Sequence, residues 1–356
     1  MSSEVGIVLR CATIHSSLSY WSDYFSPEGR AIRPGYSTGW IAERLYGILA
    51  ERGTVDYWDN AQRPLGTAAD VFVGHFWAFA DLCSGNDFER QVAVYVLSDP
   101  VRAAVLMRGA AARYGVPYPD WDLPPSDFDH EATMELADAV ILLGNSATLA
   151  TFDARWRPKI TLVNYAPGDT RWPRLSTSER RREFVYSATT CGLRKGFLDV
   201  IDTWHNIPAS ATRLHVIGRI DEPFRARLDA SRAPAVTTYG WIPSTSKRYR
   251  ALLSSCRFAY IPTWVEGQMG TLLEAIAAGC VPITTRASGI DDRLLERCIV
   301  VEPGQPDQHR DEIAKALAWS EKKYRDRQAE LSDTLKRYHT WSGFDERVRK
   351  VVWNVN

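Results

Sequence analysis

The chain has 356 residues, of which 45% are hydrophobic and 24% charged, a composition typical of a soluble globular protein with about two domains. Its 43 Lys and Arg are balanced by 43 Asp and Glu, which argues against nucleic-acid binding through bulk charge. The sequence has no apolar run as long as a membrane span and no signal-peptide pattern at its start, so we expect a cytoplasmic protein, for which peripheral membrane contact is possible but not indicated. Six scattered cysteines without a C-x-x-C pair predict reduced thiols, not disulfides or a zinc site.

The charge is unevenly distributed along the chain. Residues 1–165 carry 13 Lys and Arg against 20 Asp and Glu, whereas the remaining residues carry 30 against 23. The basic second half is therefore expected to hold an anionic ligand. The alternative is that the two halves attract each other across an interface.

Short apolar runs alternate with helical patterns through residues 1–165, which predicts a doubly wound parallel sheet. We expect its strands at residues 5–9, 55–58, 70–75, 92–97, 139–143 and 160–164. A helix is predicted at 40–52, where Ile41, Leu45 and Ile48 recur at helical spacing.

A polar, proline-containing segment at 166–182 is a candidate linker, and a second set of alternations follows it. Its strands are expected at 184–187, 213–217, 235–239, 258–261, 281–285 and 298–301, and its helices at 196–205, 246–255, 271–278 and 308–320. Two doubly wound domains that face each other leave a cleft at the carboxyl ends of their strands, where ligands bind.

Residues 261–285 carry the strongest motif, Ile-Pro-Thr-Trp-Val-Glu-Gly-Gln-Met-Gly-Thr-Leu-Leu-Glu-Ala-Ile-Ala-Ala-Gly-Cys-Val-Pro-Ile-Thr-Thr. The pattern predicts a strand, a glycine-containing loop, a short helix and another strand. Gly267 and Gly270 allow the backbone to approach a ligand closely. The N–H groups of Gly270, Thr271 and Leu272 are expected to be unpaired at the helix start, where a phosphate binds favourably.

Two glutamates accompany this loop. Glu266 is expected on the loop, facing the cleft, and Glu274 one turn into the helix, within reach of the next part of the same ligand. The alternative for Glu274 is a capping box with Thr271, in which the carboxylate only satisfies the helix start. That alternative does not account for Glu266 together with the two glycines.

The pattern Pro-Thr-x-x-Glu-Gly-x-x-Gly-x-x-x-Glu-Ala-x-Ala-x-Gly-x-x-Pro resembles the signature of retaining GT-B glycosyltransferases of the glycosyltransferase-family-4-like group. The resemblance implies a GT-B architecture of two Rossmann-like domains facing across a cleft. It implies an acceptor domain at 1–165, a linker at 166–182 and a nucleotide-sugar donor domain at 183–339. A C-terminal helix at 340–356 would pack back on the first domain.

The same resemblance implies roles for the residues of the motif. Glu266 would contact the donor sugar, and Glu274 the nucleotide ribose. The backbone from Met269 through Gly270 and Thr271 to Leu272 would contact the diphosphate, with Gly267 beside it.

Gly192-Leu-Arg-Lys-Gly resembles the family's x-K-G segment, which implies that Lys195 binds the donor phosphates. The Arg that the family places five residues before this Lys is replaced here by Thr190. Arg194 is a candidate to supply the missing charge. The alternative for Arg194 and Lys195 is a solvated helix start, which the helix dipole disfavours.

Two aromatic positions complete the expected site. Asp-Val-Phe-Val-Gly-His-Phe-Trp at 70–77 resembles a family stretch whose second His corresponds to His75, which implies that His75 lies near the sugar. The alternative is a core histidine under the strand end. Trp241 stands where the family holds the base, so it either stacks on the base or belongs to the core.

The resemblance implies a glycosyltransferase that moves a sugar from a nucleotide-diphosphate donor to an unidentified acceptor with retention of anomeric configuration, without a cofactor or a metal. Glu266, His75 and Lys195 are the expected catalytic residues. Two alternatives remain: a catalytically silent nucleotide-sugar-binding protein of this fold, and another GT-B enzyme such as a nucleotide-sugar epimerase.

Two Asp-x-Asp pairs, at 120 and 122 and at 127 and 129, are possible ligands for a divalent metal. They stand in a proline-rich insertion and not at a strand end. We therefore expect an acidic surface loop there.

Overall fold

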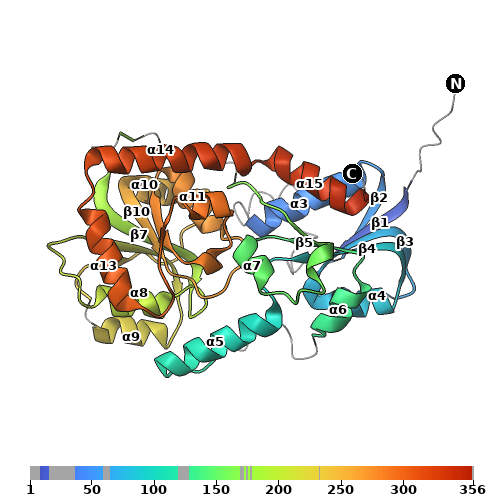
Figure 1. Ribbon diagram of the computed structural model, residues 1–356, viewed down its shortest axis with the longest axis horizontal. Helices are drawn as coiled ribbons and strands as arrows, with labels where there is room; N and C mark the ends of the chain where they lie inside the picture. The colour runs from blue at the N-terminus through green and yellow to red at the C-terminus, as the bar shows by residue number, and fades with distance from the viewer. Residues whose placement is uncertain are drawn as a thin grey trace.

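The computed structural model describes residues 9–15, 37–58, 65–118, 128–168, 172–173, 175–176, 179–231 and 233–354. Those residues form two α/β units side by side, each built around a six-stranded parallel sheet (Figure 1). Crossover helices cover the faces of such sheets, so their strands are apolar along their length. In β10 (Cys256–Ile261) every residue is buried.

The first unit contains the sheet ordered β2-β1-β3-β4-β5-β6. Its strands are β1 (Leu9–His15), β2 (Gly53–Trp58), β3 (Ala68–His75), β4 (Asp87–Tyr95), β5 (Ala139–Leu142) and β6 (Ile160–Leu162). Its helices are α3 (Ser37–Ala50), α4 (Phe79–Ser84), α5 (Pro100–Tyr114), α6 (His130–Leu136) and α7 (Ser146–Ala150), with short 3₁₀ turns η1 (Phe76–Ala78) and η3 (Arg157–Lys159). β3 pairs with β4 in a register that sets His75 opposite Val94, at the carboxyl edge of the sheet.

The second unit contains the sheet ordered β12-β11-β10-β7-β8-β9. Its other strands are β7 (Arg181–Cys191), β8 (Leu214–Ile220), β9 (Val236–Thr238), β11 (Val281–Thr284) and β12 (Ile299–Val300). Its helices are α8 (Phe197–Trp204), α9 (Phe224–Ser231), α10 (Lys247–Ser255), α11 (Gly270–Ala278), α12 (Asp292–Leu295) and α13 (Pro306–Leu317), with the 3₁₀ turn η5 (Arg286–Ser288). α11 ends at Gly279, whose φ of 97° lies in the left-handed region that favours glycine.

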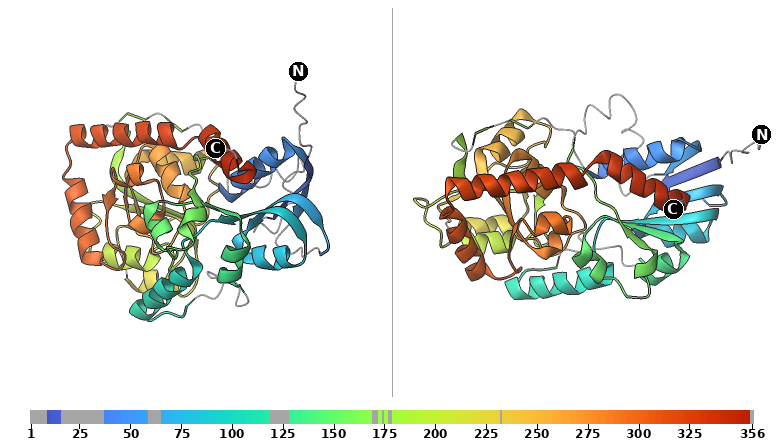
Figure 2. Two further views of the ribbon diagram at one scale, coloured as in Figure 1. Left: turned by 45° about the vertical axis from the view of Figure 1, so that its right-hand side comes forward. Right: turned by 45° about the horizontal axis from the view of Figure 1, so that its top comes forward.

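The last two helices connect the units. α14 (Glu321–Tyr338) runs along the second unit, and α15 (Trp341–Trp353) continues onto the first, as Figure 2 shows. Arg44 of α3 pairs with Asp345 at 2.9 Å, and the Arg90 side chain donates to the Val352 carbonyl at 2.8 Å. Among the described residues, no helix is both long enough and apolar enough to span a bilayer.

Two parts of the fold were not predicted. Of the first strand, expected at 5–9, residues 5–8 lie outside the described residues. The structure continues the strand to His15, where none was predicted, because pairing with β2 and β3 on either side overrides the polar residues within it. No helix was predicted at 321–338, where α14 forms. Its surface is mostly charged, and Tyr324, Leu331 and Leu335 supply most of its narrow buried stripe.

Candidate functional site

A cavity of about 480 Å³ lies between the two units, at the carboxyl ends of both sheets. From the first unit it is lined by Ile41, His75, Phe76, Trp77, Val96, Leu97, Leu143 and Tyr165. From the second unit it is lined by Ser187, Ala188, Thr189, Thr190, Gly192, Arg194, Lys195, Ile217, Trp241, Ile242, Ser244, Tyr249, Glu266, Gln268, Met269, Gly270, Thr271 and Glu274. The first wall is therefore largely apolar and aromatic, whereas the second is rich in hydroxyl and charged groups.

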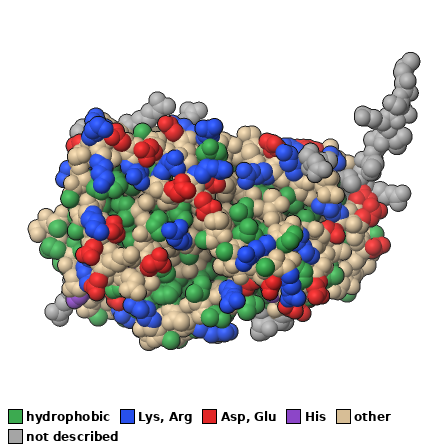
Figure 3. All heavy atoms as spheres, viewed as in Figure 1, with side chains coloured by type: hydrophobic (Ala, Val, Ile, Leu, Met, Phe, Trp, Pro, Cys, Tyr) green, Lys and Arg blue, Asp and Glu red, His purple; other side chains and the backbone are tan. Residues whose placement is uncertain are grey.

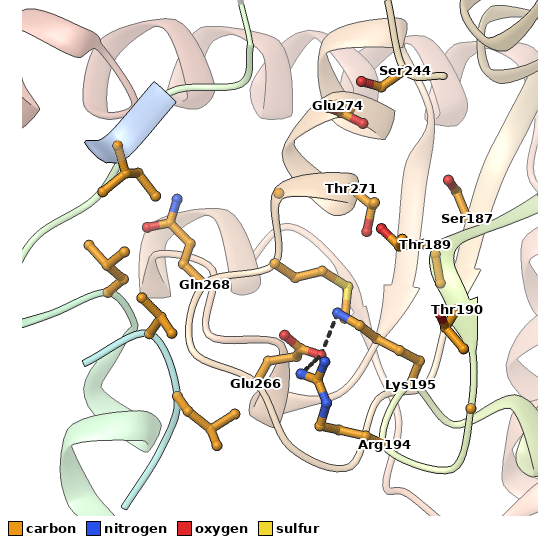
Figure 4. Close-up of a pocket in the computed structure, with 18 of the residues that line it drawn as sticks. Ser187, Thr189, Thr190, Arg194, Lys195, Ser244, Glu266, Gln268, Thr271 and Glu274 are labelled. Carbon is orange, nitrogen blue, oxygen red and sulfur yellow. Dashed lines mark hydrogen bonds and ion pairs between the residues drawn. The ribbon is translucent and has the colours of Figure 1, made fainter. Parts of the chain in front are cut away.

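Glu266 forms the centre of an ion cluster in this cavity (Figure 4). Its Oε1 accepts from Arg194 Nη1 at 2.7 Å and from Lys195 Nζ at 2.5 Å. Burial raises the pKa of Glu266, but the two cations more than offset this and hold it below its usual value. Sequence reasoning brought these three residues to one site, but it did not predict that Glu266 pairs directly with both cations.

The start of α11 faces the same cavity. The helix begins after Met269, which offers no side-chain cap, so the first N–H groups lack the usual capping acceptor. The Thr271 Oγ1 atom is buried and has no hydrogen-bond partner among the described residues. A buried hydroxyl without a partner is costly, and an anion at the helix start would satisfy it.

Glu274 is not part of a capping box. Helix α11 starts at Gly270, with Met269 as N-cap, so Thr271 does not occupy the capping position that the alternative required. The Glu274 Oε2 atom instead accepts from the Tyr249 hydroxyl at 2.6 Å, and that hydroxyl lies 3.1 Å from Ser187 Oγ. Figure 4 shows the Glu274 carboxyl and the Ser187 hydroxyl at the end of the pocket away from Glu266.

Two expected donor contacts, Gly267 and Leu272, are not among the residues that line the cavity. A Cβ at Gly267 would stand 2.2 Å from the Val96 carbonyl oxygen and 2.7 Å from that of Leu143. The absence of a side chain thus lets the loop touch the backbone of the first unit. The Leu272 side chain is fully buried in the hydrophobic core.

His75 lines the cavity from the first unit and is buried. The Trp77 backbone N–H donates to His75 Nδ1 at 3.5 Å, and the imidazole ring lies against Phe76, with 4.6 Å between ring centroids. His75 therefore combines a packed core position with access to the cavity. Trp241, by contrast, is 49% exposed at the cavity wall, so it does not belong to the core.

Thr190, which stands in place of the family's Arg, also lines the cavity. Its Oγ1 accepts from Arg219 Nη2 at 3.2 Å. Arg219 lies on the neighbouring strand β8 and brings a guanidinium group to this position. Sequence reasoning did not find Arg219, because its contact depends on the pairing of β7 with β8.

Sequence reasoning also missed residues that join the units beside the cavity. Gln268 Nε2 donates to the Tyr165 carbonyl at 3.0 Å, while the Tyr165 hydroxyl donates to the Gln268 carbonyl at 2.6 Å. His339 Nδ1 lies 2.9 Å from the same Tyr165 carbonyl. These bonds connect three segments that are far apart in the sequence, so no local pattern could reveal them.

Of the two Asp-x-Asp pairs, only Asp129 lies within the described residues, where its carboxylate caps α6 by accepting from the Ala132 N–H. A group with metal-ligating atoms does occur in the described residues: Glu183, His215 and Cys256, whose ligand atoms lie within 4.8 Å of one another. Glu183 already pairs with His215 at 2.7 Å and with Arg181 at 2.9 Å. The group stands at the amino ends of its strands, away from the cavity.

Comparisons with known proteins agree with this architecture. Residues 181–318, which make up most of the second unit, match the family Glycosyl transferases group 1. A search of the sequences of curated proteins gave no match.

Solved structures resemble the whole chain. Sucrose-phosphate synthase from Thermosynechococcus elongatus is 13% identical with a TM-score of 0.66, covering 97% of this chain and 98% of that one. WaaG, a glycosyltransferase involved in lipopolysaccharide biosynthesis, is 15% identical with a TM-score of 0.63, over 96% and 99%. Anabaena HepE, in complex with UDP and glucose, is 9% identical with a TM-score of 0.65, over 97% and 100%. These likenesses confirm the predicted GT-B fold of two Rossmann-like domains.

Proposed function

We propose that this chain is a glycosyltransferase that takes a sugar from a nucleotide-diphosphate donor held on the second domain. The observation that carries the proposal is the convergence of the uncapped start of α11, the buried Thr271 hydroxyl and the cations Arg194 and Lys195 on one cavity. Together they offer hydrogen-bond donors and positive charge to a diphosphate. The family match over residues 181–318 supports the same assignment.

The donor would lie along the wall of the second domain. With its diphosphate at Thr271 and Lys195, the nucleotide would extend toward Glu274 and the exposed indole of Trp241. Glu274 Oε2 is held by Tyr249, which leaves its other oxygen to accept from ribose hydroxyls. The sugar would extend the other way, toward Glu266.

The chemistry follows from these positions. When the bond from the anomeric carbon to the diphosphate breaks, negative charge develops on the leaving phosphate. Lys195, Arg194 and the helix start stabilise that charge without reorganising. An acceptor hydroxyl that attacks from the face of the departing diphosphate gives retention of configuration. These cationic groups would stabilise the charge on the leaving phosphate in place of a divalent ion. We therefore expect sugar transfer to persist in EDTA.

The acceptor would bind against the first domain. Trp77 offers it aromatic surface, and the buried Trp77 Nε1 has no hydrogen-bond partner among the described residues. His75 is placed beside Trp77, where its imidazole can contact the acceptor hydroxyl or the transferred sugar.

The primary test measures binding and transfer separately. Calorimetry with uridine, guanosine and adenosine diphosphates should find one that binds, and Lys195→Ala should weaken that binding by ~1.5–3 kcal/mol, the contribution of a charge-assisted hydrogen bond. The parent nucleoside should bind Lys195→Ala and the wild type alike. Equal losses for nucleoside and diphosphate would show that Lys195 acts through structure.

Transfer is tested with the matching nucleotide-sugars and a panel of glycoside acceptors, with the anomeric configuration of the product read by NMR. A diphosphate that binds without any turnover of its sugar conjugate would favour the catalytically silent protein. Conversion of the nucleotide-sugar into an isomer would instead favour an epimerase. Activity lost in EDTA and restored by manganese would contradict the role given to the cationic side chains.

A further inference from the structure

Three side chains that can bind a metal lie side by side on the sheet of the second unit. Glu183 belongs to β7, and the two strands that flank β7 carry Cys256 in β10 and His215 in β8. Strand residues two positions apart point to the same face of a sheet. Val185 and Ile217, each two residues after a member of this group, share one buried cluster with Cys256. The carboxylate, the imidazole and the thiol therefore lie on one face of three adjacent strands.

The imidazole of His215 is held in an orientation that suits metal binding. Its Nε2 atom lies 2.7 Å from Glu183 Oε2, and its Nδ1 atom lies 2.8 Å from the Tyr239 hydroxyl. Metal-binding histidines usually hydrogen-bond through their second ring nitrogen, which fixes the ring and its tautomer. The Tyr239 hydroxyl can accept from Nδ1–H when Nε2 binds a metal, because a hydroxyl both donates and accepts.

The thiol of Cys256 indicates which metal these residues suit. Sulfur and imidazole nitrogen are ligands that zinc prefers, whereas calcium and magnesium take oxygen. Zinc–ligand bonds of about 2.0–2.3 Å set tetrahedral ligands about 3.3–3.8 Å apart. The three ligand atoms already lie within 4.8 Å of one another. Burial raises the pKa of the Cys256 thiol to about 12, but a coordinated zinc ion deprotonates a thiol outright.

We propose that Glu183, His215 and Cys256 form a structural zinc site at the amino ends of β7, β8 and β10. The ion would replace the hydrogen bond between His215 and Glu183 and connect the three strands. The Glu183 side chain is 18% exposed, which gives the ion an entry path and a place for water as the fourth ligand. The cavity lies at the opposite, carboxyl ends of the strands, so this ion would stabilise the second unit without taking part in sugar transfer. Sequence reasoning predicted no zinc site, because only the sheet brings these scattered residues together.

The guanidinium group of Arg181 opposes a cation at this position. Its Nη1 atom pairs with Glu183 Oε2 at 2.9 Å, and its Nη2 atom donates to Ser255 Oγ at 2.7 Å. The side chain is 47% exposed, so solvent screens its charge in part. Arg181→Gln should therefore strengthen zinc binding by severalfold. A group of side chains that serves only as an ion pair would show no such gain.

Metal binding to the full chain, first dialysed against EDTA, tests the proposal. Calorimetry should detect a single zinc ion per chain, and Co²⁺ should give a thiolate-to-cobalt charge-transfer band in the near ultraviolet. Tyr239→Phe should weaken zinc binding by about 10- to 100-fold, the usual effect of losing a partner of a metal ligand. Cys256→Ser removes a ligand itself, so it should abolish the cobalt band and weaken zinc binding by more than about a hundredfold.

Cys280→Ser is the matched control. Cys280 is also buried, and its thiol donates to the Cys256 carbonyl at 3.5 Å, but it is not a member of the group. This variant should keep the cobalt band and the zinc affinity of the wild type. Glu183→Gln preserves the shape of a ligand without its charge, so it decides the question if Cys256→Ser does not fold. Three results would overturn the proposal: no zinc binding to the wild type, unchanged zinc affinity in Glu183→Gln, or equal loss of the cobalt band in both cysteine variants.

Discussion

The pKa of Glu274 is raised to about 7, because the effect of burial exceeds the opposing effect of the hydrogen bond from Tyr249. The carboxylate is therefore poised to titrate near neutral pH. If its ionised form accepts from ribose hydroxyls, nucleotide affinity should fall as the pH drops below about 7. The carboxyl would then be protonated and would lose acceptor capacity.

Tyr249→Phe removes the donor that stabilises the ionised Glu274, so the pKa of Glu274 should rise further. The midpoint of the affinity profile should move up by about one to two pH units, which corresponds to a hydrogen bond to a charged group. Calorimetry with a nucleoside diphosphate at several pH values measures this change. The titration of the phosphate is common to both proteins, so their difference isolates Glu274.

Tyr239→Phe is a suitable comparison, because Tyr239 bonds His215 at 2.8 Å and does not line the cavity. Its profile should match the wild type. A profile of Tyr249→Phe with an unchanged midpoint would show that Tyr249 supports only packing.

The ion pairs of Glu266 with Arg194 and Lys195 lead to a second prediction for a single residue. The Glu266 carboxylate pairs with both cations to which the diphosphate is proposed to bind, so Glu266→Gln should strengthen binding of a nucleoside diphosphate. A charge removed at about 6 Å from the phosphates changes the binding free energy by about 3 kcal/mol, or affinity by about a hundredfold, at an effective dielectric constant of about 20. Transfer of the sugar should fall at the same time, since Glu266 is assigned to the sugar.

Calorimetry with the diphosphate and a transfer assay separate these two effects. Glu266→Asp keeps the charge and should not show the gain in affinity. Weaker diphosphate binding in Glu266→Gln would mean that Glu266 instead positions Arg194 and Lys195 for the phosphates.

At the scale of the elements, α5 and α8 meet at a buried carboxylate. Asp199 accepts from the Tyr114 hydroxyl at 2.7 Å, from Trp264 Nε1 at 2.5 Å and from the Gly304 N–H at 2.6 Å. The pKa of Asp199 is raised to about 6, because the effect of burial exceeds the opposing effect of these hydrogen bonds. Trp264 precedes Glu266 by two residues, and its backbone N–H donates to the Arg194 carbonyl at 2.9 Å. Asp199 therefore supports the loops that carry the ion cluster.

The raised pKa of Asp199 predicts a pH dependence of stability. Between about pH 4 and pH 6 the folded protein keeps a proton that the unfolded chain releases, so the free energy of unfolding falls as the pH rises through this window. The contribution is ~3 kcal/mol across the window, because a pKa difference of one between the folded and unfolded states corresponds to about 1.36 kcal/mol. Below pH 4 both states are protonated, and above pH 6 both are ionised.

Urea unfolding of wild type and Asp199→Asn at several pH values measures this contribution. The difference in the free energy of unfolding between wild type and Asp199→Asn should change by about 3 kcal/mol from pH 4 to pH 6. Asp202→Asn, on the same helix and paired with Arg227 at 3.3 Å, controls for the loss of a carboxylate. A difference between wild type and Asp199→Asn that is constant with pH would contradict the buried titration.

Most helices and strands could be predicted from the sequence. The contacts that were missed depend on how distant segments pack together. The motif residues Lys195, Glu266 and Glu274 are found because strand, loop and helix follow one another in a short stretch of chain. Tyr249 was missed because its bond to Glu274 depends on how α10 packs against α11, which no local pattern encodes. Arg219 was missed because its contact with Thr190 depends on the pairing of β7 with β8. The contacts of Gly267 with Val96 and Leu143 were missed because these residues come from the other domain.

At the scale of the whole molecule, the cavity is divided between two domains of different character. The wall from the second domain is polar and cationic, and the wall from the first domain is largely apolar and aromatic, with polar groups on His75, Trp77 and Tyr165. The two walls are held together by Gln268 and Tyr165 beside the cavity and by α15, which packs on the first domain. In the proposed function, transfer would require both walls, whereas nucleotide binding would require only the second.

A substitution at His75 therefore tests whether transfer, but not nucleotide binding, depends on the first domain. His75→Ala should lower kcat far more than it raises the KM for the donor, because the imidazole belongs to the wall that the nucleotide does not touch. Nucleoside diphosphate affinity, measured by calorimetry, should remain at the wild-type level. The ring also packs on Phe76, so part of any loss could come from the fold.

Two comparisons separate these causes. His75→Phe preserves an aromatic ring in the packed position but removes the imidazole nitrogens, so it should keep the melting temperature better than His75→Ala and still lose turnover. Phe76→Leu disturbs the same packing and leaves His75 in place, so it should lower the melting temperature with a smaller kinetic defect. If turnover follows the melting temperature across all three variants, His75 is a packing residue of the first domain. If turnover follows the imidazole alone, the first domain takes part in the reaction through His75.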